Sequence, residues 1–334
     1  MSDLVSILIP AFNAERWLGD TIASALAQTW GRKEIIVVDD GSTDATLAVA
    51  RGFADRGVQV LSQTNQGAAA ARNTALRAAR GSYIQFLDAD DLLHPRKIEA
   101  QMLGAEDGSR SRVLLTCRWG RFFARPGQAR FAPDELWQDL SPVAWIVTKF
   151  TANRFMFPAS WLVSRRLADD AGAWNEGLSL DDDGEYMCRL VAASERVRFV
   201  AAAECYYRIG NAGSLSSQRS DRAVRSGFLS MRLCIARLRA LEDSERTRQA
   251  CVRLLQDNLP HFYPDKADLV DACRCLAREL GGDLLPPDER FHFRLFRGLF
   301  GWRRAKQFRA ALGDVKLRVR RWMDDAKRFD ARAN

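Results

Sequence analysis

The chain has 334 residues, of which 47% are hydrophobic, so it is long enough for one large domain or two ordinary ones with a buried core. Seven scattered cysteines and three histidines far apart argue against a zinc site or a histidine-based metal site, and free thiols suit a reducing compartment. The net charge of +8 comes from residues 290–334, which carry 14 Lys and Arg against 4 Asp and Glu; the remainder has 36 (50 less 14) against 38 (42 less 4).

The first hundred residues alternate between two periodicities. Apolar runs at 5–9, 34–38, 58–61 and 83–87 are typical of buried strands, and 113–117 is predicted as a fifth. Helices are expected over 17–28, over a segment that runs from a Ser-Thr cap at 42–43 to residue 50, and over the alanine-rich segment 67–79. This alternation predicts a parallel sheet covered by helices on both faces. In such sheets, ligands bind beyond the carboxyl ends of the strands.

Three carboxylates directly follow the fourth predicted strand, in Asp88-Ala89-Asp90-Asp91. Because buried carboxylates repel each other, they predict a divalent cation, and Mg²⁺ or Mn²⁺ prefers such oxygen ligands. The alternative is a solvated turn in which Asp91 caps a helix that begins near Leu92. Polar residues also end the first two strands, at 10–13 and 39–40, while the absence of Gly-x-Gly-x-x-Gly disfavours a dinucleotide fold of the dehydrogenase type.

The rest of the chain divides into a mixed segment and a helical one. Residues 118–220 contain a second acidic cluster, Asp-Asp-Asp-Gly-Glu at 181–185. From about residue 221 the pattern is helical, and apolar residues at spacings of three and four predict a last helix over 308–329. Because the sequence has neither a signal-peptide pattern nor an apolar run of membrane-spanning length, we expect a cytoplasmic protein.

Several of these motifs together carry a family resemblance. They are the segments 5–13, 34–44, 65–67 with 71–73, and 86–91. In their order and spacing, residues 4–95 resemble the inverting family 2 glycosyltransferases, and the resemblance extends more weakly to about residue 217. It implies an α/β fold of the GT-A type, a mostly parallel sheet flanked by helices, with a C-terminal helical appendage. We therefore predict a catalytic domain over 1–220, divided into a nucleotide-sugar-binding half (1–117) and an acceptor half (118–220), and a helical, basic region over 221–334.

The resemblance also implies roles for individual residues at the donor site. Phe12 would pack on the nucleobase, and Asp40, with Asp39 beside it, would accept the ring N–H of a pyrimidine. Arg72 would donate to the base or the phosphates. The implied donor set is Pro10, Ala11, Phe12, Asn13, Asp39, Asp40, Gly67, Arg72 and Asp88; Asp90 would bind Mn²⁺ or Mg²⁺, and Asp88 would share the metal or hold the ribose.

Three of these residues have a purely structural alternative. Phe12 could be an ordinary core residue. Asp40 could serve only a turn and a helix cap. Arg72 could lie exposed on a helix surface, as most arginines do.

The catalytic base is expected in the second acidic cluster. The resemblance implies Asp183 as the general base, with Asp182 as its neighbour. Crowding by Asp181, Asp182 and Glu185 is expected to raise the pKa of one carboxylate, which suits a base. The alternative is an acidic loop at a helix N-terminus, where carboxylates also favour the helix dipole.

The chain departs from the family at one position near the metal. Many relatives carry a histidine shortly after the segment that corresponds to Tyr206-Tyr207-Arg208, and this sequence has none there. If that histidine contributes to metal or phosphate binding, Arg208 or Asn211 must substitute for it.

Together these observations predict a metal-dependent, inverting glycosyltransferase. It would move a sugar from a nucleotide-diphospho-sugar, UDP-linked as is commonest in the family, to a hydroxyl of a glycan or a lipid-linked saccharide. The alternative is a non-catalytic nucleotide-sugar-binding or scaffold protein of the same fold. A nucleotidyltransferase is disfavoured, because residues 10–15 offer no glycine-rich loop with Lys or Arg.

The basic C-terminal segment, residues 290–334, allows two interpretations. Its aromatic and arginine residues are typical of a helix lying on an anionic membrane, which would make the protein peripheral at the inner face of the membrane. Alternatively its apolar stripe packs on the catalytic domain and its basic face is solvated, which is the interpretation we favour. Nucleic acid is not an expected partner, because no recognition motif accompanies the charge.

Overall fold

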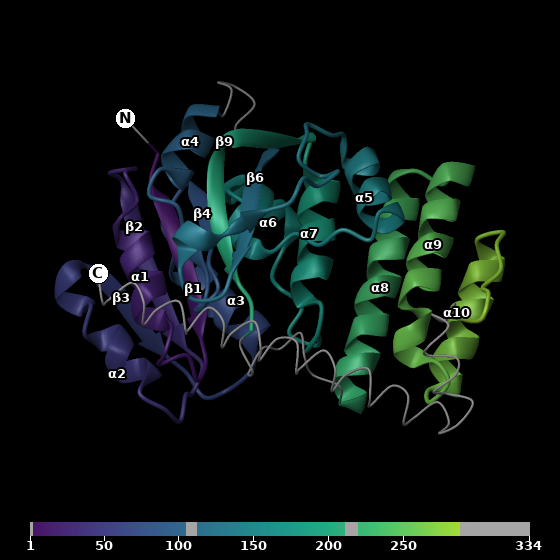
Figure 1. Ribbon diagram of the computed structural model, residues 1–334, viewed down its shortest axis with the longest axis horizontal. Helices are drawn as coiled ribbons and strands as arrows, with labels where there is room; N and C mark the ends of the chain where they lie inside the picture. The colour runs from purple at the N-terminus through teal and green to yellow at the C-terminus, as the bar shows by residue number, and fades with distance from the viewer. Residues whose placement is uncertain (1–2, 105–111, 211–219, 288–334) are drawn as a thin grey trace.

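The computed structural model describes residues 3–104, 112–210 and 220–287. Two β-sheets lie at the centre of these residues, and a group of long helices lies at one end of the molecule (Figure 1). The first sheet holds five strands in the order β3-β2-β1-β4-β8 and the second holds four in the order β5-β9-β6-β7.

The first sheet is the mostly parallel sheet that the sequence predicts. Its strands are β1 (Val5–Ala11), β2 (Lys33–Asp39), β3 (Val58–Ser62), β4 (Tyr83–Phe86) and β8 (Val163–Ser164). The first four run parallel, and β8 pairs antiparallel with β4. All seven residues of β1 are buried, because helices cover both faces of the sheet.

The connecting helices follow the predicted periodicity. They are α1 (Leu18–Leu26), α2 (Thr46–Arg51) and α3 (Ala68–Ala78), with the short 3₁₀ turn η1 (Ala54–Arg56) before β3. In α1, Leu18, Ile22 and Ala25 form the buried face. The carboxyl ends of β1, β2 and β4 therefore meet at one edge of the sheet, where the polar segments follow.

The second sheet is formed largely by segments that show no clear strand pattern in the sequence. It consists of β5 (Leu92–Leu93), β6 (Val113–Phe122), β7 (Arg130–Phe131) and β9 (Arg196–Arg208). The long strands β6 and β9 run parallel, with a register shift between Cys117 and Arg118. The predicted strand at 113–117 is thus only the first half of β6.

The interpretation of Asp91 as the cap of a helix that begins near Leu92 is wrong. Leu92 and Leu93 form strand β5, which pairs with β9, and the next helix, α4 (Lys97–Gly104), begins four residues later. Asp91 is fully buried and its carboxylate accepts a hydrogen bond from the backbone N–H of Arg208 (2.8 Å). Strand pairing has therefore overridden the local capping signal at this position.

The remaining elements lie between residues 126 and 193 and in a C-terminal layer of helices. They are η2 (Pro126–Gln128), α5 (Pro142–Thr151), η3 (Pro158–Ser160), α6 (Arg165–Ala171), α7 (Asp182–Ala193), α8 (Asp221–Leu241), α9 (Glu245–Phe262) and α10 (Ala267–Glu279). One hydrophobic cluster continues from Leu8 and Phe86 in the sheet to Cys234 on α8 and Leu255 on α9. The helices after residue 220 thus extend the core of the sheet domain.

Two expectations concern parts of the chain outside the described residues. The helix predicted over 308–329 and the basic segment 290–334 lie outside the described residues. Among the helices that are described, none is long and apolar enough to cross a membrane.

Candidate active site

The first part of the site follows β1. Pro10 and Ala11 are the last, buried residues of that strand, and Phe12 beyond them is 49% exposed, so the alternative of an ordinary core residue is wrong. Asn13 has a left-handed backbone conformation (φ 47°) and holds the next loop. Its N–H donates to Ser42 Oγ (3.0 Å) and its side-chain oxygen accepts from the N–H of Thr43 (2.9 Å). This leaves the phenyl ring of Phe12 open at the edge of the sheet.

The two carboxylates after β2 have different surroundings. Asp40 accepts hydrogen bonds from the Gln63 side chain (2.8 Å) and from the backbone N–H groups of Gln66 (2.9 Å) and Gly67 (2.8 Å). It thereby fixes the loop that leads into α3. Asp39 is only 2% exposed, and within the described residues its Oδ1 accepts no hydrogen bond. The unpaired acceptor at this edge therefore belongs to Asp39, and it is buried, whereas the oxygens of Asp40 already hold the loop.

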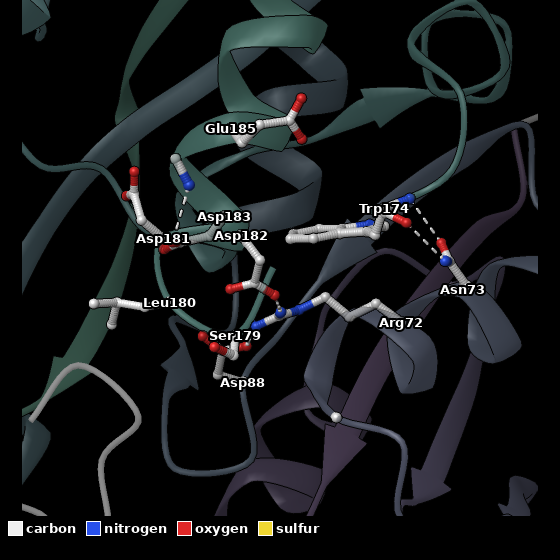
Figure 2. A network of polar contacts seen from close by, with 12 residues as sticks. Arg72, Asn73, Asp88, Trp174, Ser179, Leu180, Asp181, Asp182, Asp183 and Glu185 are labelled. Carbon is white, nitrogen blue, oxygen red and sulfur yellow. Dashed lines mark hydrogen bonds and ion pairs between the residues drawn. The ribbon is translucent and has the colours of Figure 1, made fainter. Parts of the chain in front are cut away.

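Arg72 joins the two acidic segments (Figure 2). Its guanidinium contacts Asp88 Oδ1 through Nη2 and Asp182 Oδ2 through Nη1, both at 2.7 Å, and lies 4.4 Å from the centre of the Trp174 ring. Arg72 is 5% exposed, so the alternative of a surface helix residue is wrong. Burial alone would lower its pKa, but the two carboxylates outweigh burial and raise it. The charge is thus compensated in the interior, as buried charges require.

Asn73, the next residue on α3, fixes the segment that precedes the second acidic cluster (Figure 2). Its amide nitrogen donates to the Trp174 carbonyl (3.0 Å) and to Glu176 Oε1 (2.7 Å), and its oxygen accepts from the Trp174 N–H (2.8 Å). The Trp174 ring stacks on Tyr186 of α7, with centroids 4.1 Å apart. Asn73 lies in one of the motifs of the resemblance and Trp174 in the region over which the resemblance is weaker, but the sequence assigned neither of them a role.

The second acidic cluster is held from α8. Asp181 has a left-handed conformation (φ 60°) at the start of α7, and its carboxylate accepts from the Ser230 hydroxyl (2.6 Å). The Ser226 hydroxyl accepts from the N–H groups of Ser179 (2.8 Å) and Leu180 (3.0 Å). No sequence signal pointed to these two serines, since they lie more than forty residues from the loop that they support.

Asp183 has the electrostatic character of a base that works near neutral pH. Burial raises its pKa to about 7, and the neighbouring carboxylates of Asp182 and Asp181 act in the same direction, while Arg72 opposes them. Asp182 is neutralised by its ion pair with Arg72. Crowding by the neighbouring carboxylates therefore raises the pKa of Asp183 as expected, but burial contributes more to the increase.

The corner formed by Asp88, Asp90 and Asp91 is held by Arg208. The Arg208 backbone N–H donates to Asp91, and its Nε donates to the backbone carbonyl of Asp90 (2.7 Å). Its guanidinium lies between the rings of Trp17 (4.3 Å) and Phe122 (4.5 Å). Arg208 is thus a structural support of this corner, and Asn211, the other proposed substitute for the family's histidine, lies outside the described residues.

The corner offers few protein ligands to a cation. In the described part of the chain, no group of three or more His, Cys, Asp or Glu side chains is arranged to hold a metal ion. The carboxylates of Asp88 and Asp90 are hard oxygen donors of the kind that Mn²⁺ and Mg²⁺ prefer. They fit a cation that completes its coordination with phosphate oxygens and water, because Mg²⁺ commonly binds through one or two carboxylates and substrate phosphates.

Comparison with known sequences agrees with this arrangement. The family model "Glycosyl transferase family 2" matches residues 6–168. The chain is 43% identical over 102 residues to an uncharacterized glycosyltransferase of Haemophilus influenzae, covering 30% of this chain and 41% of that protein. It is 43% identical over 100 residues to the Escherichia coli protein named UDP-Glc:alpha-D-GlcNAc-diphosphoundecaprenol beta-1,3-glucosyltransferase WfgD, covering 30% and 40%. The chain thus spans less than half the length of these curated relatives.

Solved structures share the fold over most of the chain. S. aureus TarS in complex with UDP-GlcNAc matches with a TM-score of 0.65 at 18% identity, covering 83% of this chain and 88% of that one. Mannosyltransferase PcManGT from Pyrobaculum calidifontis in complex with GDP-Man and Mn2+ matches with a TM-score of 0.56 at 16% identity, covering 97% and 88%. The fold is therefore the GT-A fold, as predicted. Residues 6–168, just under half of the chain, match the glycosyl transferase family 2 model, so this segment is a glycosyl transferase family 2 domain.

Proposed function

We propose that this protein transfers a sugar from a nucleotide-diphospho-sugar to a hydroxyl of a saccharide acceptor, with inversion at the anomeric carbon. The observation that carries the proposal is the bridge made by Arg72. One guanidinium contacts Asp88, in the candidate metal corner, and Asp182, beside the candidate base. Groups that would serve the leaving diphosphate and the attacking hydroxyl are thereby held next to each other, although they lie far apart in the sequence.

The donor would lie along the carboxyl ends of β1, β2 and β4. The exposed ring of Phe12 offers a stacking surface for a nucleobase, and the unpaired Oδ1 of Asp39 offers an acceptor for a ring N–H. Asp88 and Asp90 would hold Mn²⁺ or Mg²⁺, which when bound neutralises charge on the diphosphate. TarS has been solved in complex with UDP-GlcNAc and PcManGT in complex with GDP-Man and Mn2+, and the name of WfgD specifies UDP-Glc; we propose uridine as the base for this protein.

Asp183 would accept the proton of the acceptor hydroxyl. As that proton leaves, the acceptor oxygen forms a bond to the anomeric carbon from the face opposite the diphosphate, and the bond from that carbon to the phosphate oxygen breaks. A carboxylate whose pKa lies at about 7 is ionised in about half of the molecules at neutral pH, which suits a general base. The acceptor is proposed to be a glycan or a lipid-linked saccharide, the latter because the name of WfgD specifies a diphosphoundecaprenol-linked sugar.

Calorimetric titration and a nucleotide-release assay test the proposal together. We expect UDP-glucose or UDP-GlcNAc to bind in the presence of Mn²⁺ and UDP to be released. Asp183→Asn should bind the same donor with unchanged affinity and release UDP about 10²–10⁴-fold more slowly, the usual contribution of a general base. Donor binding without turnover in the wild-type protein would instead favour the non-catalytic alternative. A full rate in Asp183→Asn would remove Asp183 from the reaction.

The charge of the basic segment supports a separate proposal about where in the cell the protein acts. Its excess of ten positive charges within residues 290–334 (14 less 4) would attract an anionic membrane surface and bring the protein to a lipid-linked acceptor. Co-sedimentation with phosphatidylserine-containing vesicles should be stronger for the full chain than for a chain ending at residue 287. Equal binding of the two chains would leave the segment without a membrane role.

A further inference from the structure

A cluster of aromatic rings borders the acidic corner of the site. It comprises Trp119 of β6, Tyr207 of β9, and Phe155 and Phe157 from the loop between α5 and η3, and we call it the aromatic platform. Tyr207 lies 5.0 Å from Phe157, 5.6 Å from Phe155 and 6.0 Å from Trp119, measured between ring centroids. These are ordinary distances for interacting aromatic pairs, so the four rings pack as one unit.

The pairing of β6 with β9 determines which side chains join the platform. Arg121 lies opposite Tyr207, and Trp119 lies opposite Cys205, two residues before Tyr207. Because side chains alternate between the faces of a strand, Trp119, Arg121 and Tyr207 share one face of the sheet. Arg208 and Phe122 are paired on the other face, where the Arg208 guanidinium contacts the Phe122 ring.

The platform lies close to both parts of the proposed active site. Arg208, the neighbour of Tyr207, donates hydrogen bonds to Asp90 and Asp91, which ties the end of β9 to the metal corner. Burial raises the pKa of Tyr207 most, and the carboxylates of Asp91, Asp90, Asp88 and Asp183 raise it further. The phenol is therefore within electrostatic reach of the metal corner and of the candidate base.

One ring of the platform is left open to solvent. Phe155 is 40% exposed, whereas Phe157 and Trp119 are buried. Arg121 is also exposed, and its guanidinium lies 5.0 Å from the centre of the Trp119 ring. The Arg121 guanidinium donates no hydrogen bond to any residue that the structure describes. An exposed phenyl ring on a packed aromatic base, next to such an arginine, is the composition of a ligand site with an apolar floor and a few polar groups at its edge.

We propose that the aromatic platform is the acceptor subsite and that a pyranose ring of the acceptor stacks on Phe155. The C–H face of a pyranose is apolar and packs on aromatic rings, while its hydroxyl groups would accept hydrogen bonds from Arg121. A sugar held there would present a hydroxyl toward Asp183. The inference rests on the proposed glycosyl transfer and names the class of acceptor and the residues that select it.

The chain contains a matched control for Phe155. Phe131 of β7 is exposed to a similar extent, at 36%, and it packs on Tyr206, whose side chain lies on the opposite face of β9 from Tyr207. Phe155→Ala and Phe131→Ala therefore remove the same half-exposed group from the two faces of one sheet. A loss of affinity due only to destabilisation of the sheet would affect both variants.

The test uses the full chain with Mn²⁺ and a panel of methyl glycosides of glucose, galactose, mannose and N-acetylglucosamine, with UDP present for the NMR measurements and UDP-glucose or UDP-GlcNAc as the donor for the kinetic ones. Saturation-transfer difference NMR should detect contact between the wild-type protein and the C–H protons of at least one glycoside. Phe155→Ala should weaken that signal and raise the acceptor KM about tenfold, with the donor KM and the rate of donor hydrolysis unchanged. Phe131→Ala and the restoring variant Phe155→Tyr should behave as wild type.

Three outcomes overturn the inference: no glycoside contacts the wild-type protein, Phe155→Ala behaves as Phe131→Ala, or the donor KM changes together with the acceptor KM. The failure of the proposed function has a different signature. In that case no UDP is released by the wild-type protein or by any of the variants, whether or not UDP-glucose or UDP-GlcNAc binds in the presence of Mn²⁺.

Discussion

Replacing Asp183 by asparagine should stabilise the protein at alkaline pH while it slows transfer about 10²–10⁴-fold. An aspartate in the unfolded chain ionises near 3.8, whereas the Asp183 carboxyl in the folded protein has a pKa of about 7. Between these two values the folded state binds a proton that the unfolded state has lost, so folding becomes less favourable as the pH rises through this window. Because asparagine does not ionise, the variant does not lose stability as the pH rises through this window.

The magnitude follows from the difference between the two pKa values. At about 1.4 kcal/mol for each pH unit, the full loss in the wild-type protein is about 4 kcal/mol above pH 7. Solvent reaches part of the Asp183 side chain and reduces the effect, so we expect the variant to gain roughly 1–3 kcal/mol at pH 8. Most of this gain should develop between pH 5 and pH 7, and little of it should remain at pH 3.

Urea denaturation of the two proteins at pH 5 and pH 8 measures the gain directly. Asp182→Asn is the control of opposite sign, because it removes a partner from buried Arg72 and should destabilise the fold at both pH values. In the wild-type enzyme, kcat should fall about tenfold per pH unit below pH 6, since only the ionised carboxylate acts as a base. The raised pKa of Asp183 is refuted if Asp183→Asn is less stable than wild type at pH 8, or if its gain in unfolding free energy is the same at both pH values.

Three further changes probe other parts of the site. Arg72→Met leaves the carboxylates of Asp88 and Asp182 without their cation, so it should lower the free energy of unfolding by about 3–5 kcal/mol in urea denaturation. Because Arg72 lowers the pKa of Asp183, the same change should move the acid limb of the pH–rate profile to higher pH, and an unchanged profile would contradict the bridge. Phe12→Ala should change stability by less than about 0.5 kcal/mol but weaken UDP binding by about 1–3 kcal/mol in calorimetry, the usual loss of one stacking contact. Asp39→Asn should weaken UDP binding without loosening the fold, whereas Asp40→Asn should increase hydrogen exchange of the 63–67 loop; the reverse pattern would exchange their roles.

Much of the first sheet could be predicted from local patterns. Each of its four parallel strands shows an apolar run of its own, and strand alternates with helix, so the parallel sheet and its ligand-binding edge follow from periodicity alone, whereas the short antiparallel strand β8 was not predicted. The motifs around Phe12, Asp40, Arg72 and Asp90 then suggested a family, and the family comparison agrees. The interpretation of Asp91 as a helix cap was wrong because a capping signal is local, whereas its outcome depended on β9, more than a hundred residues away.

The sequence by itself therefore determined the class of fold and the list of chemically competent residues. Only the tertiary structure decided how these residues are combined. The Arg72 bridge joins side chains 110 residues apart, the serines of α8 hold a loop more than forty residues upstream, and the aromatic platform draws on β6, β9 and an intervening loop. Periodicity reports which face of an element is buried, but it carries no information about which distant element covers that face. The pairing of β6 with β9 and the packing of α8 on α7 supply that information.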